Sequence, residues 1–409
     1  MYNPQYLTLG KKYDPKKYVL AEFYLESVLS LGQAAAALAS ESSIGTWTEV
    51  GTLKTDKFEK LAARVYAIER KKNTFKVAYP LALFEPGNLP QLLSSVAGNI
   101  YSLKEIKKLR MLNLEFPENY INSFSGPAFG LPGVRKITGV KKRPLIGVII
   151  KPKMGLSASA HARVAALVLK NGADLVKDDE NLTSQKFNPF QERVVKTLRE
   201  VHKIEKTVKT RKLIAFNVTA ETSEMIKRAK FVKARGGRCV MVDLVTAGFS
   251  AVQALRKANL GLIIHGHRAM HSAFTRSKDY GMNFYVLAKL SRLAGIDQLH
   301  IGTAVGKMEG GKKEVTDNIS FLKSRFGRLK PVMPIASGGL HPGLVPALLK
   351  ITGPDAIINF GGGVHGHPAG SGEGAKAAFQ AVESVLENIE LKKYAALKPA
   401  LNSALKHFK

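Results

Sequence analysis

Eight short apolar runs, spread evenly over the second part of the chain, constrain the possible fold most strongly. Each run is rich in Val, Ile and Leu and is followed by a segment with helical periodicity, such as HARVAALVLKNG. The runs are LIGVIIK, ADLVK, LIAFNV, CVMVDL, LGLIIHGH, QLHIG, VMPIASGG and AIINFGGG. Eight strand-helix units over about 250 residues match the size of a (β/α)8 TIM barrel, whose strands are buried on both faces. A doubly wound open sheet is the alternative, but it seldom needs eight equally spaced parallel units.

The first 125 residues have a different, mixed pattern. Residues 17–27, 76–84 and 111–116 are predicted to be strands, residues 32–43 and 88–103 helices, and the short segment 45–50 is β-prone. We therefore predict an α/β protein with two domains. Residues 1–125 would form a smaller α+β, ferredoxin-like domain, and residues 126–409 a TIM-barrel catalytic domain with C-terminal helices.

Composition argues against several classes of protein. Hydrophobic residues make up 45% of the 409 residues, which is ordinary for a globular chain. The sequence has no long apolar run and its first residues, MYNPQYLTLGKKYDPKKY, lack the apolar core of a signal peptide, so a cytoplasmic protein without a membrane span is expected. Cys239 is the only cysteine, which excludes an intrachain disulfide and predicts a small buried hydrophobic residue.

The net charge is +30, because 62 basic residues face 32 acidic ones. Basic clusters occur at Lys11-Lys12, Lys16-Lys17, Arg70 to Lys72, Lys104 to Arg110, Lys141 to Arg143 and Lys203 to Lys212. They are scattered along the sequence, and in KIEKTVKTRK no aromatic side chain is interleaved to stack on bases. This pattern favours solvated helix faces over specific nucleic-acid binding, with a general attraction for anions such as a phosphorylated substrate.

The run LVKDDEN combines one lysine with three consecutive carboxylates at the end of a predicted strand. Strand alternation would point Lys177 and Asp179 to one side, Asp178 to the other, and Glu180 could turn in at the mouth of the strand. Such oxygen ligands suit Mg²⁺. An ammonium group cannot ligate a cation, so Lys177 is either a charge-neutralising spectator or is chemically converted into an anion. A solvated loop is the alternative interpretation.

Polar residues and glycines follow most of the eight strands, and the carboxyl ends of barrel strands form the functional rim. These residues are Lys151 and Lys153 after the first strand, His265, His267 and Arg268 after the fifth, His300 on the sixth, and Gly-Gly pairs after the last two. Glycine-rich ends can bind a phosphate through backbone N–H groups, and Arg268 with His300 could hold a second phosphate. We expect the positive charges of Lys151 and Lys153 to lower the pKa of Lys177, so that a neutral amine could react with CO2.

At these residues the sequence resembles the large subunit of ribulose-1,5-bisphosphate carboxylase/oxygenase (Rubisco) over nearly its whole length. The motifs that carry the resemblance are IIKPKMGLS, KDDEN, HRAMH, HIGTAVGKMEGG, ASGGLH, FGGG, ESSIGTW and the pair Gly98-Asn99. The stretch GGGVHGHPAGSGEGAKA is most similar to the archaeal form III branch.

The resemblance implies a catalytic and metal-binding set. Lys177 would be carbamylated by activator CO2 and bind Mg²⁺ together with Asp179 and Glu180. Lys151 would be the general acid/base, with Lys153 in support. His267 would lie near the reacting carbons, and Lys307 would close over CO2 on a mobile loop.

The resemblance also implies substrate contacts and an assembly. Arg268, His300 and Ser337 would bind one phosphate of ribulose 1,5-bisphosphate; Gly338, Gly339, Gly361, Gly362, Thr46 and Trp47 would lie around the other. Glu41, Thr46, Trp47 and Asn99 would complete the active site of a neighbouring subunit, so a homodimer or a ring of dimers is expected. Ile149 and Asn359 depart from the plant-type pattern, which has threonine and glutamine there.

The activity implied is Mg²⁺-dependent carboxylation of ribulose 1,5-bisphosphate to 3-phosphoglycerate, with O2 as the competing substrate, in archaeal-type AMP and nucleotide salvage. A Rubisco-like enolase or isomerase of methionine salvage is the nearest alternative. Those relatives usually lack part of the set Lys307, Glu41 and Asn99, which is complete here. A nucleic-acid-binding protein on an inactive barrel is the alternative from another class, and it rests on the charge alone.

Overall fold

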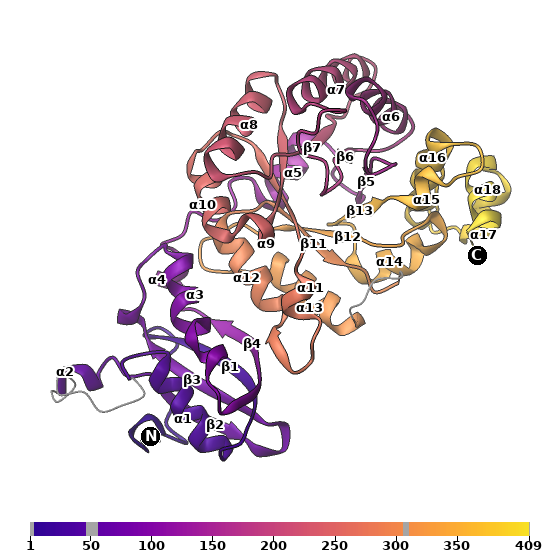
Figure 1. Cartoon of the computed structure of the whole chain (residues 1–409). Coiled ribbons are helices and arrows are strands. Elements are labelled where there is room, and N and C mark those ends of the chain that lie inside the picture. The colour runs from indigo at the N-terminus through magenta and orange to yellow at the C-terminus, as the bar shows by residue number, and fades with distance from the viewer. Residues whose placement is uncertain (1–3, 46–55, 306–310, 409) are drawn as a thin grey trace. The chain divides into compact units, whose positions relative to one another are not determined.

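The computed structural model describes residues 4–45, 56–305 and 311–408 (Figure 1). The chain divides into two compact units. The first consists of residues 1–125, 270–294 and 326–329, and the second of residues 126–269, 295–325 and 330–409. The first unit therefore includes two segments whose sequence positions lie inside the barrel region.

The second unit contains a closed barrel of eight parallel strands, in the order β5-β6-β7-β8-β9-β11-β12-β13 (Figure 1). The strands are β5 (Leu145–Ile149), β6 (Leu175–Lys177), β7 (Leu213–Asn217), β8 (Cys239–Asp243), β9 (Ile263–His267), β11 (Gln298–Gly302), β12 (Met333–Ser337) and β13 (Ile357–Phe360). Each of the eight predicted apolar runs contains one of these strands, so the predicted (β/α)8 barrel is confirmed. Because all strands are parallel, their carboxyl ends lie on one rim.

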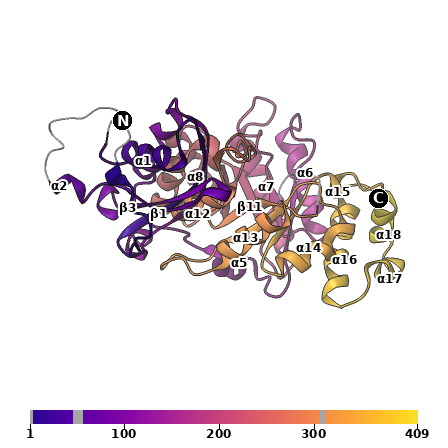
Figure 2. The same cartoon turned by 90° about the horizontal axis from the view of Figure 1, so that it is seen from below.

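Helices follow most of the barrel strands and cover the outside of the barrel (Figure 1). The helices of this unit are α5 (Gly130–Thr138), α6 (Ala158–Lys170), α7 (Phe190–Glu205), α8 (Thr222–Ala234), α9 (Leu244–Ala247), α10 (Phe249–Lys257), α13 (Lys312–Lys323), η6 (Pro342–Leu344), α14 (Val345–Thr352), α15 (Gly362–His365), α16 (Ser371–Leu386), α17 (Leu391–Ala396) and α18 (Pro399–His407). At the C-terminal end of the chain, α16 packs on α18 through Ala377, Ala400 and Ala404 (Figure 2).

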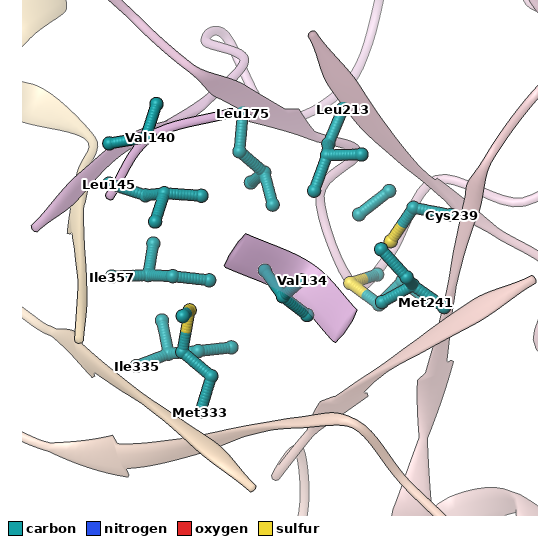
Figure 3. Close-up of a cluster of buried hydrophobic side chains, with 12 residues drawn as sticks. Val134, Val140, Leu145, Leu175, Leu213, Cys239, Met241, Met333, Ile335 and Ile357 are labelled. Carbon is teal, nitrogen blue, oxygen red and sulfur yellow. The ribbon is translucent and has the colours of Figure 1, made fainter. Parts of the chain in front are cut away.

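Apolar side chains fill the barrel at the end opposite the functional rim (Figure 3). Leu145, Leu175 and Ile357 point inward from the strands toward Val134, which α5 places at the centre of the ring. The helix is held there by Asp297, whose Oδ1 accepts hydrogen bonds from the backbone N–H groups at positions 129 and 130, at 2.7 and 2.8 Å. Side chains therefore close this end of the barrel, and an active site can lie only at the carboxyl-end rim.

The first unit is built on a separate five-stranded sheet in the order β10-β4-β1-β3-β2. Its elements are η1 (Pro4–Tyr6), β1 (Tyr18–Ser27), α1 (Leu31–Glu41), α2 (Asp56–Glu59), β2 (Arg64–Glu69), η3 (Arg70–Lys72), β3 (Thr74–Pro80), η4 (Leu81–Leu83), α3 (Leu89–Ala97), η5 (Asn99–Ser102), β4 (Ile106–Glu115), α4 (Glu118–Ile121), α11 (Ser272–Thr275), β10 (Tyr280–Met282) and α12 (Phe284–Ala294). β1 pairs antiparallel with β3 and β4, whereas β10 joins β4 in parallel. The predicted N-terminal domain with its own sheet is confirmed.

Several element boundaries in this unit differ from the prediction. The helix expected over residues 88–103 ends at Ala97, because Gly98 leaves helical geometry at φ −74° and ψ −115°. A Cβ there would lie 2.2 Å from the carbonyl oxygen of Ser94, so only glycine fits this turn. The strands β2 and β10 were not predicted, and β4 begins five residues before the expected strand. The β-prone segment 45–50 lies, apart from its first residue, outside the described residues.

The basic residues of the barrel are more concentrated than the sequence suggested. The connections that precede β5 to β9 are residues 139–144, 171–174, 206–212, 235–238 and 258–262, and together they hold nine basic residues and one acidic residue. Because the strands are parallel, these connections share the rim opposite the functional one, so the clusters at 141–143 and 203–212 are not scattered. Positive charge at helix C-termini is favourable there, since the helix dipole is negative at that end. The cluster at 104–110 lies mainly on strand β4 and not on a helix.

Two predictions from composition concern burial and membranes. Cys239 is fully buried on β8 within the barrel core, as expected for a small hydrophobic residue, and burial raises the pKa of its thiol well above the usual value. In the part of the chain that the structure describes, none of the helices combines the length and the apolar character needed to span a bilayer.

Candidate active site

Lys177 is the last residue of β6 and lies at the centre of the functional rim with no solvent exposure. Its Nζ donates a hydrogen bond to the backbone oxygen of Asp178 at 2.8 Å and lies 3.5 Å from Glu180 Oε2. The Glu180 side chain keeps 27% of its surface exposed, so it faces the open mouth of the barrel. The structure thus brings the buried amine and this carboxylate together, and solvent reaches the site from the Glu180 side.

The pKa of Lys177 is lowered, in the predicted direction but for a different reason. Burial is the largest cause, and the carboxylates of Glu180 and Asp179 offset part of its effect. The neighbouring lysines do not supply this shift. Lys151 is neutralised by Asp179, whose Oδ2 is 2.7 Å from the Lys151 Nζ, and Lys153 is exposed to solvent. The predicted cause is therefore wrong, because those positive charges are paired or solvated.

Asp178 lies behind the rim and belongs to a buried ion-pair cluster. Its carboxylate is 3.0 Å from Arg193 Nε and 3.1 Å from His161 Nε2, and it accepts a hydrogen bond from the Asn217 backbone at 3.0 Å. Burial alone would raise the pKa of Asp178, but Arg193 and His161 outweigh it and lower this pKa to about 2. Arg193 also donates to the backbone oxygen of Thr183 at 2.7 Å, so it holds the loop that follows Asp179 and Glu180. This cluster fixes the base of the site.

His267 ends β9 and contacts two carboxylates. Its Nδ1 lies 2.8 Å from Asp243 Oδ1, and its Nε2 lies 3.8 Å from Glu180 Oε2. Burial, followed by the positive charge of Lys177, lowers the pKa of His267, while Asp243 partly opposes this. Asp243 is only 4% exposed and was not predicted, although it is the last residue of β8 and so lies on the same rim. Its carboxylate keeps the Nδ1 proton in place and leaves Nε2 facing Glu180.

His300 and Arg268 come from neighbouring strands β11 and β9. His300 Nδ1 lies 2.8 Å from Ser337 Oγ, and its Nε2 lies 2.8 Å from His265 Nε2. Both ring nitrogens of His300 are thus engaged with neighbouring side chains. Arg268 is 8% exposed, and burial lowers its pKa to about 10. Gly302 has φ +82° and a Cβ there would lie 2.4 Å from a guanidinium nitrogen of Arg268, so glycine is needed for this close approach.

The glycines after β12 and β13 expose backbone at the rim. Gly338 and Gly339 have φ values of +114° and +64°, a conformation that disfavours other residues. A Cβ added to Gly361 would come within 3.7 Å of Lys151 Cε, and one added to Gly362 would meet nothing within 4 Å. The second glycine pair therefore lies next to Lys151 and borders open space.

The remaining predicted residues lie elsewhere in the chain. Within the first unit, Asn99 Nδ2 donates to Glu41 Oε1 at 3.3 Å, so these two side chains lie together. Thr46, Trp47 and Lys307 are outside the described residues.

The metal-ligand chemistry is incomplete until Lys177 is modified. Among the described residues, no group of three or more His, Cys, Asp and Glu side chains is arranged to hold a metal ion. Asp179 and Glu180 supply two carboxylates beside the Lys177 amine, and a third oxygen donor requires conversion of this amine to a carbamate. With that conversion the residues fit Mg²⁺, which prefers hard oxygen ligands.

Comparison with known families identifies the family of the chain. The family model described as "Ribulose bisphosphate carboxylase large chain, catalytic domain" matches residues 130–408, and the corresponding N-terminal domain model matches residues 8–120. The chain belongs to the ribulose bisphosphate carboxylase large-chain family. Ribulose bisphosphate carboxylase of Methanocaldococcus jannaschii is 47% identical over 401 residues, covering 93% of this chain and 94% of the relative, and that of Pyrococcus abyssi is 44% identical, covering 96% and 94%.

Solved Rubisco structures match the fold over nearly the whole chain. The octameric Rubisco of Pyrococcus horikoshii OT3, in complex with sulfate, has a TM-score of 0.95 and 43% identity, covering 98% of this chain and 96% of its own. The dimeric archaeal Rubisco of Hyperthermus butylicus has a TM-score of 0.92 and 39% identity, covering 98% of each chain. The chain is therefore an archaeal-type member of the family, and it has the family's catalytic domain.

Proposed function

We propose that the chain is an Mg²⁺-dependent carboxylase of ribulose 1,5-bisphosphate that also reacts with O2. The observation that carries the proposal is the fully buried Lys177 amine, which has Glu180 at 3.5 Å and Asp179 and Lys151 on the same rim. Burial lowers the pKa of Lys177, and a neutral amine is the form that reacts with activator CO2.

The Lys177 carbamate would hold Mg²⁺ together with the carboxylates of Asp179 and Glu180. When bound, the ion stabilises the negative charge that develops on the enediolate oxygens of the substrate. Lys177 as carbamate takes the C3 proton, and CO2 or O2 then forms a bond to C2. After CO2 addition, water adds to C3 and the C2–C3 bond breaks, and the carbanion left at C2 takes up a proton, which gives two molecules of 3-phosphoglycerate.

Protons at the reacting carbons would be handled by two further groups. Lys151, which is hydrogen-bonded to Asp179, is placed to act as general acid/base with Lys153 in support. His267 presents Nε2 toward the mouth of the barrel because Asp243 binds Nδ1. Burial lowers the pKa of His267, so its imidazole is neutral near pH 7 and Nε2 can accept a proton.

The two phosphates of the substrate would bind at opposite sides of the rim. Arg268 would supply the charge at one side, with His300 and Ser337 beside it. Gly338, Gly339, Gly361 and Gly362 would offer backbone N–H groups at the other, together with Thr46 and Trp47. The reacting carbons, which lie between the two phosphates of the substrate, would then be held over the metal site at Lys177.

A subunit assembly follows from the same family. One structural relative is dimeric and another octameric, and we propose a homodimer or a ring of dimers for this chain. Glu41 and Asn99, which lie together in the first unit, would then serve the active site of a neighbouring subunit. From the form III likeness of residues 361–377 we propose that the reaction serves nucleotide salvage.

The direct test is fixation of labelled bicarbonate into acid-stable 3-phosphoglycerate by the purified protein with ribulose 1,5-bisphosphate and Mg²⁺. We expect label in the product, and loss of label when EDTA removes Mg²⁺, with recovery when Mg²⁺ is restored. A protein that enolises the substrate without fixing label would instead be an enolase-type relative, and the carboxylase proposal would be wrong.

Lys307→Ala is expected to lower carboxylation about a hundredfold, because the variant lacks the cation that supports the new carboxylate. Exchange of the C3 proton with solvent should remain measurable, since this step precedes CO2 addition. Lys312, five residues later in the sequence, provides a matched control whose alanine variant should keep both activities. Loss of proton exchange in Lys307→Ala would assign Lys307 an earlier role.

A further inference from the structure

A chain of four hydrogen-bonded side chains crosses three neighbouring barrel strands beside the site. Gln298 on β11 and His265 on β9 are register partners, His300 lies two residues after Gln298, and Ser337 ends β12. Gln298 Oε1 lies 2.8 Å from His265 Nδ1, which extends the two contacts already described for His300. Gln298, His265 and His300 are at most 1% exposed, and only Ser337 reaches the open rim.

With Gln298 Oε1 as the acceptor, one order of protons satisfies all three contacts. Burial lowers the pKa of His265 to about 3 and that of His300 well below its usual value, so each ring carries one N–H at neutral pH. With Oε1 of Gln298 as acceptor, His265 carries its proton on Nδ1 and accepts at Nε2. His300 then donates from Nε2, and its Nδ1 accepts the hydroxyl proton of Ser337.

We propose that Gln298 is a positioning residue that sets this proton order from the buried end of the chain and so orients the Ser337 hydroxyl at the rim. In this order the Ser337 proton is committed to His300, so the hydroxyl offers only oxygen lone pairs and would accept from a hydroxyl group of the substrate, while the Arg268 guanidinium binds the neighbouring phosphate. A half-turn of the Gln298 amide would place Nε2 against His265. Donor and acceptor would then exchange roles in each of the three contacts between Gln298 and Ser337.

The orientation of the Gln298 amide therefore decides the direction of hydrogen-bond donation along these four side chains. Its Nε2 is buried without a hydrogen-bond partner among the described residues, so its orientation is set through the oxygen contact with His265. A buried polar group left half-satisfied is unusual and calls for a functional reason. The inference rests on the proposed function, because His300 and Ser337 matter for catalysis only if the substrate binds at this side of the rim.

The test compares Gln298→Met with a matched control in the same layer of the barrel. Met333 on β12 is the register partner of Gln298 and is fully buried, so Met333→Leu changes packing there without touching the hydrogen bonds. Side-chain ¹⁵N NMR of histidine-labelled protein would report which ring nitrogen of His265 and His300 carries the proton. Steady-state kinetics with ribulose 1,5-bisphosphate would report KM and kcat.

We expect wild-type His265 to be protonated on Nδ1 and this preference to be lost in Gln298→Met. KM should rise about fivefold with kcat changed less than about twofold, since a hydrogen bond near the substrate loses its orientation. Met333→Leu should leave both the tautomers and KM unchanged. Gln298→Glu keeps an accepting oxygen and should retain the Nδ1 proton, which provides a second variant if Gln298→Met does not fold.

Three results would overturn the inference: a wild-type His265 proton on Nε2, unchanged tautomers in Gln298→Met, or an equal KM shift in Met333→Leu. The NMR measurement needs no substrate. A protein without carboxylase activity would therefore refute the proposed function while leaving the proton order open to direct measurement.

Discussion

Lys177→Ala is expected to lower carboxylation of ribulose 1,5-bisphosphate by about a thousandfold or more, because the variant has neither the base nor the third oxygen donor for Mg²⁺. Asp179 and Glu180 would remain in the variant, but these two carboxylates cannot supply the third metal ligand and the base that the carbamate provides. The measurement is acid-stable label from bicarbonate, normalised to folded protein. A ¹³C NMR signal of the carbamate, present in wild type with ¹³CO2 and Mg²⁺ and absent in the variant, would assign the modification to Lys177.

The matched control for this experiment is Lys212→Ala. Lys212 is also a buried lysine, at 6% exposure, but it precedes β7 at the opposite end of the barrel and donates to the backbone oxygen of Ala173 at 2.7 Å. We expect the specific activity of its folded fraction to stay within about twofold of wild type, since surface and structural sites far from a reacting centre change stability more than rate. Comparable loss in both variants would show that burial of a lysine, and not its position, matters.

Arg193→Met should destabilise the protein by about 3–5 kcal/mol, because it leaves the buried carboxylate of Asp178 without its main positive partner. Both side chains are fully buried, and their atoms lie 3.0 Å apart. The midpoint of thermal unfolding is expected to fall by at least about 6 °C. Activity should fall as well, because Arg193 also holds the loop after Glu180 through the backbone oxygen of Thr183.

The control for this variant is Arg199→Met on the same helix α7, where the arginine is exposed and should change stability by less than about 0.5 kcal/mol. The pH dependence provides a second check. The pKa of Asp178 is lowered from its ordinary 3.8 to about 2, so its ion pairs stabilise the fold above about pH 4 and are lost as the pH falls toward 2. The stability difference between wild type and Arg193→Met should therefore shrink over that range, and a constant difference would argue against the ion pair as its cause.

Local patterns in the sequence were sufficient for the barrel but not for the whole N-terminal sheet. The barrel strands are short apolar runs with regular spacing, and this signal is local. Strand β2 was missed because only one of its six residues, Val65, is fully buried, so it shows little alternation of polar and apolar side chains. Its position depends on antiparallel pairing with β3. Pairing between two strands cannot be predicted from the sequence of either strand alone.

The candidate site was predictable in its location and only partly in its contacts. The rule that barrel chemistry lies at the carboxyl ends of the strands was enough to select Lys177, Glu180, His267 and Arg268. It did not reveal Asp243, Arg193 or Gln298 as their partners. These residues are single polar side chains within ordinary segments, and they acquire a role only because neighbouring segments place them 3.0 Å or less from His267, Asp178 and His265.

The sequence by itself determined the order of strands and helices in the barrel, the end of the barrel at which chemistry occurs and the family to which the residues at that end point. The tertiary structure decided why the pKa of Lys177 is lowered, which carboxylate balances Lys151 and which side chains connect Gln298 to Ser337. The physical reason is that secondary structure and side-chain direction follow from local periodicity, whereas burial and hydrogen-bond partners are sums over segments far apart in the chain.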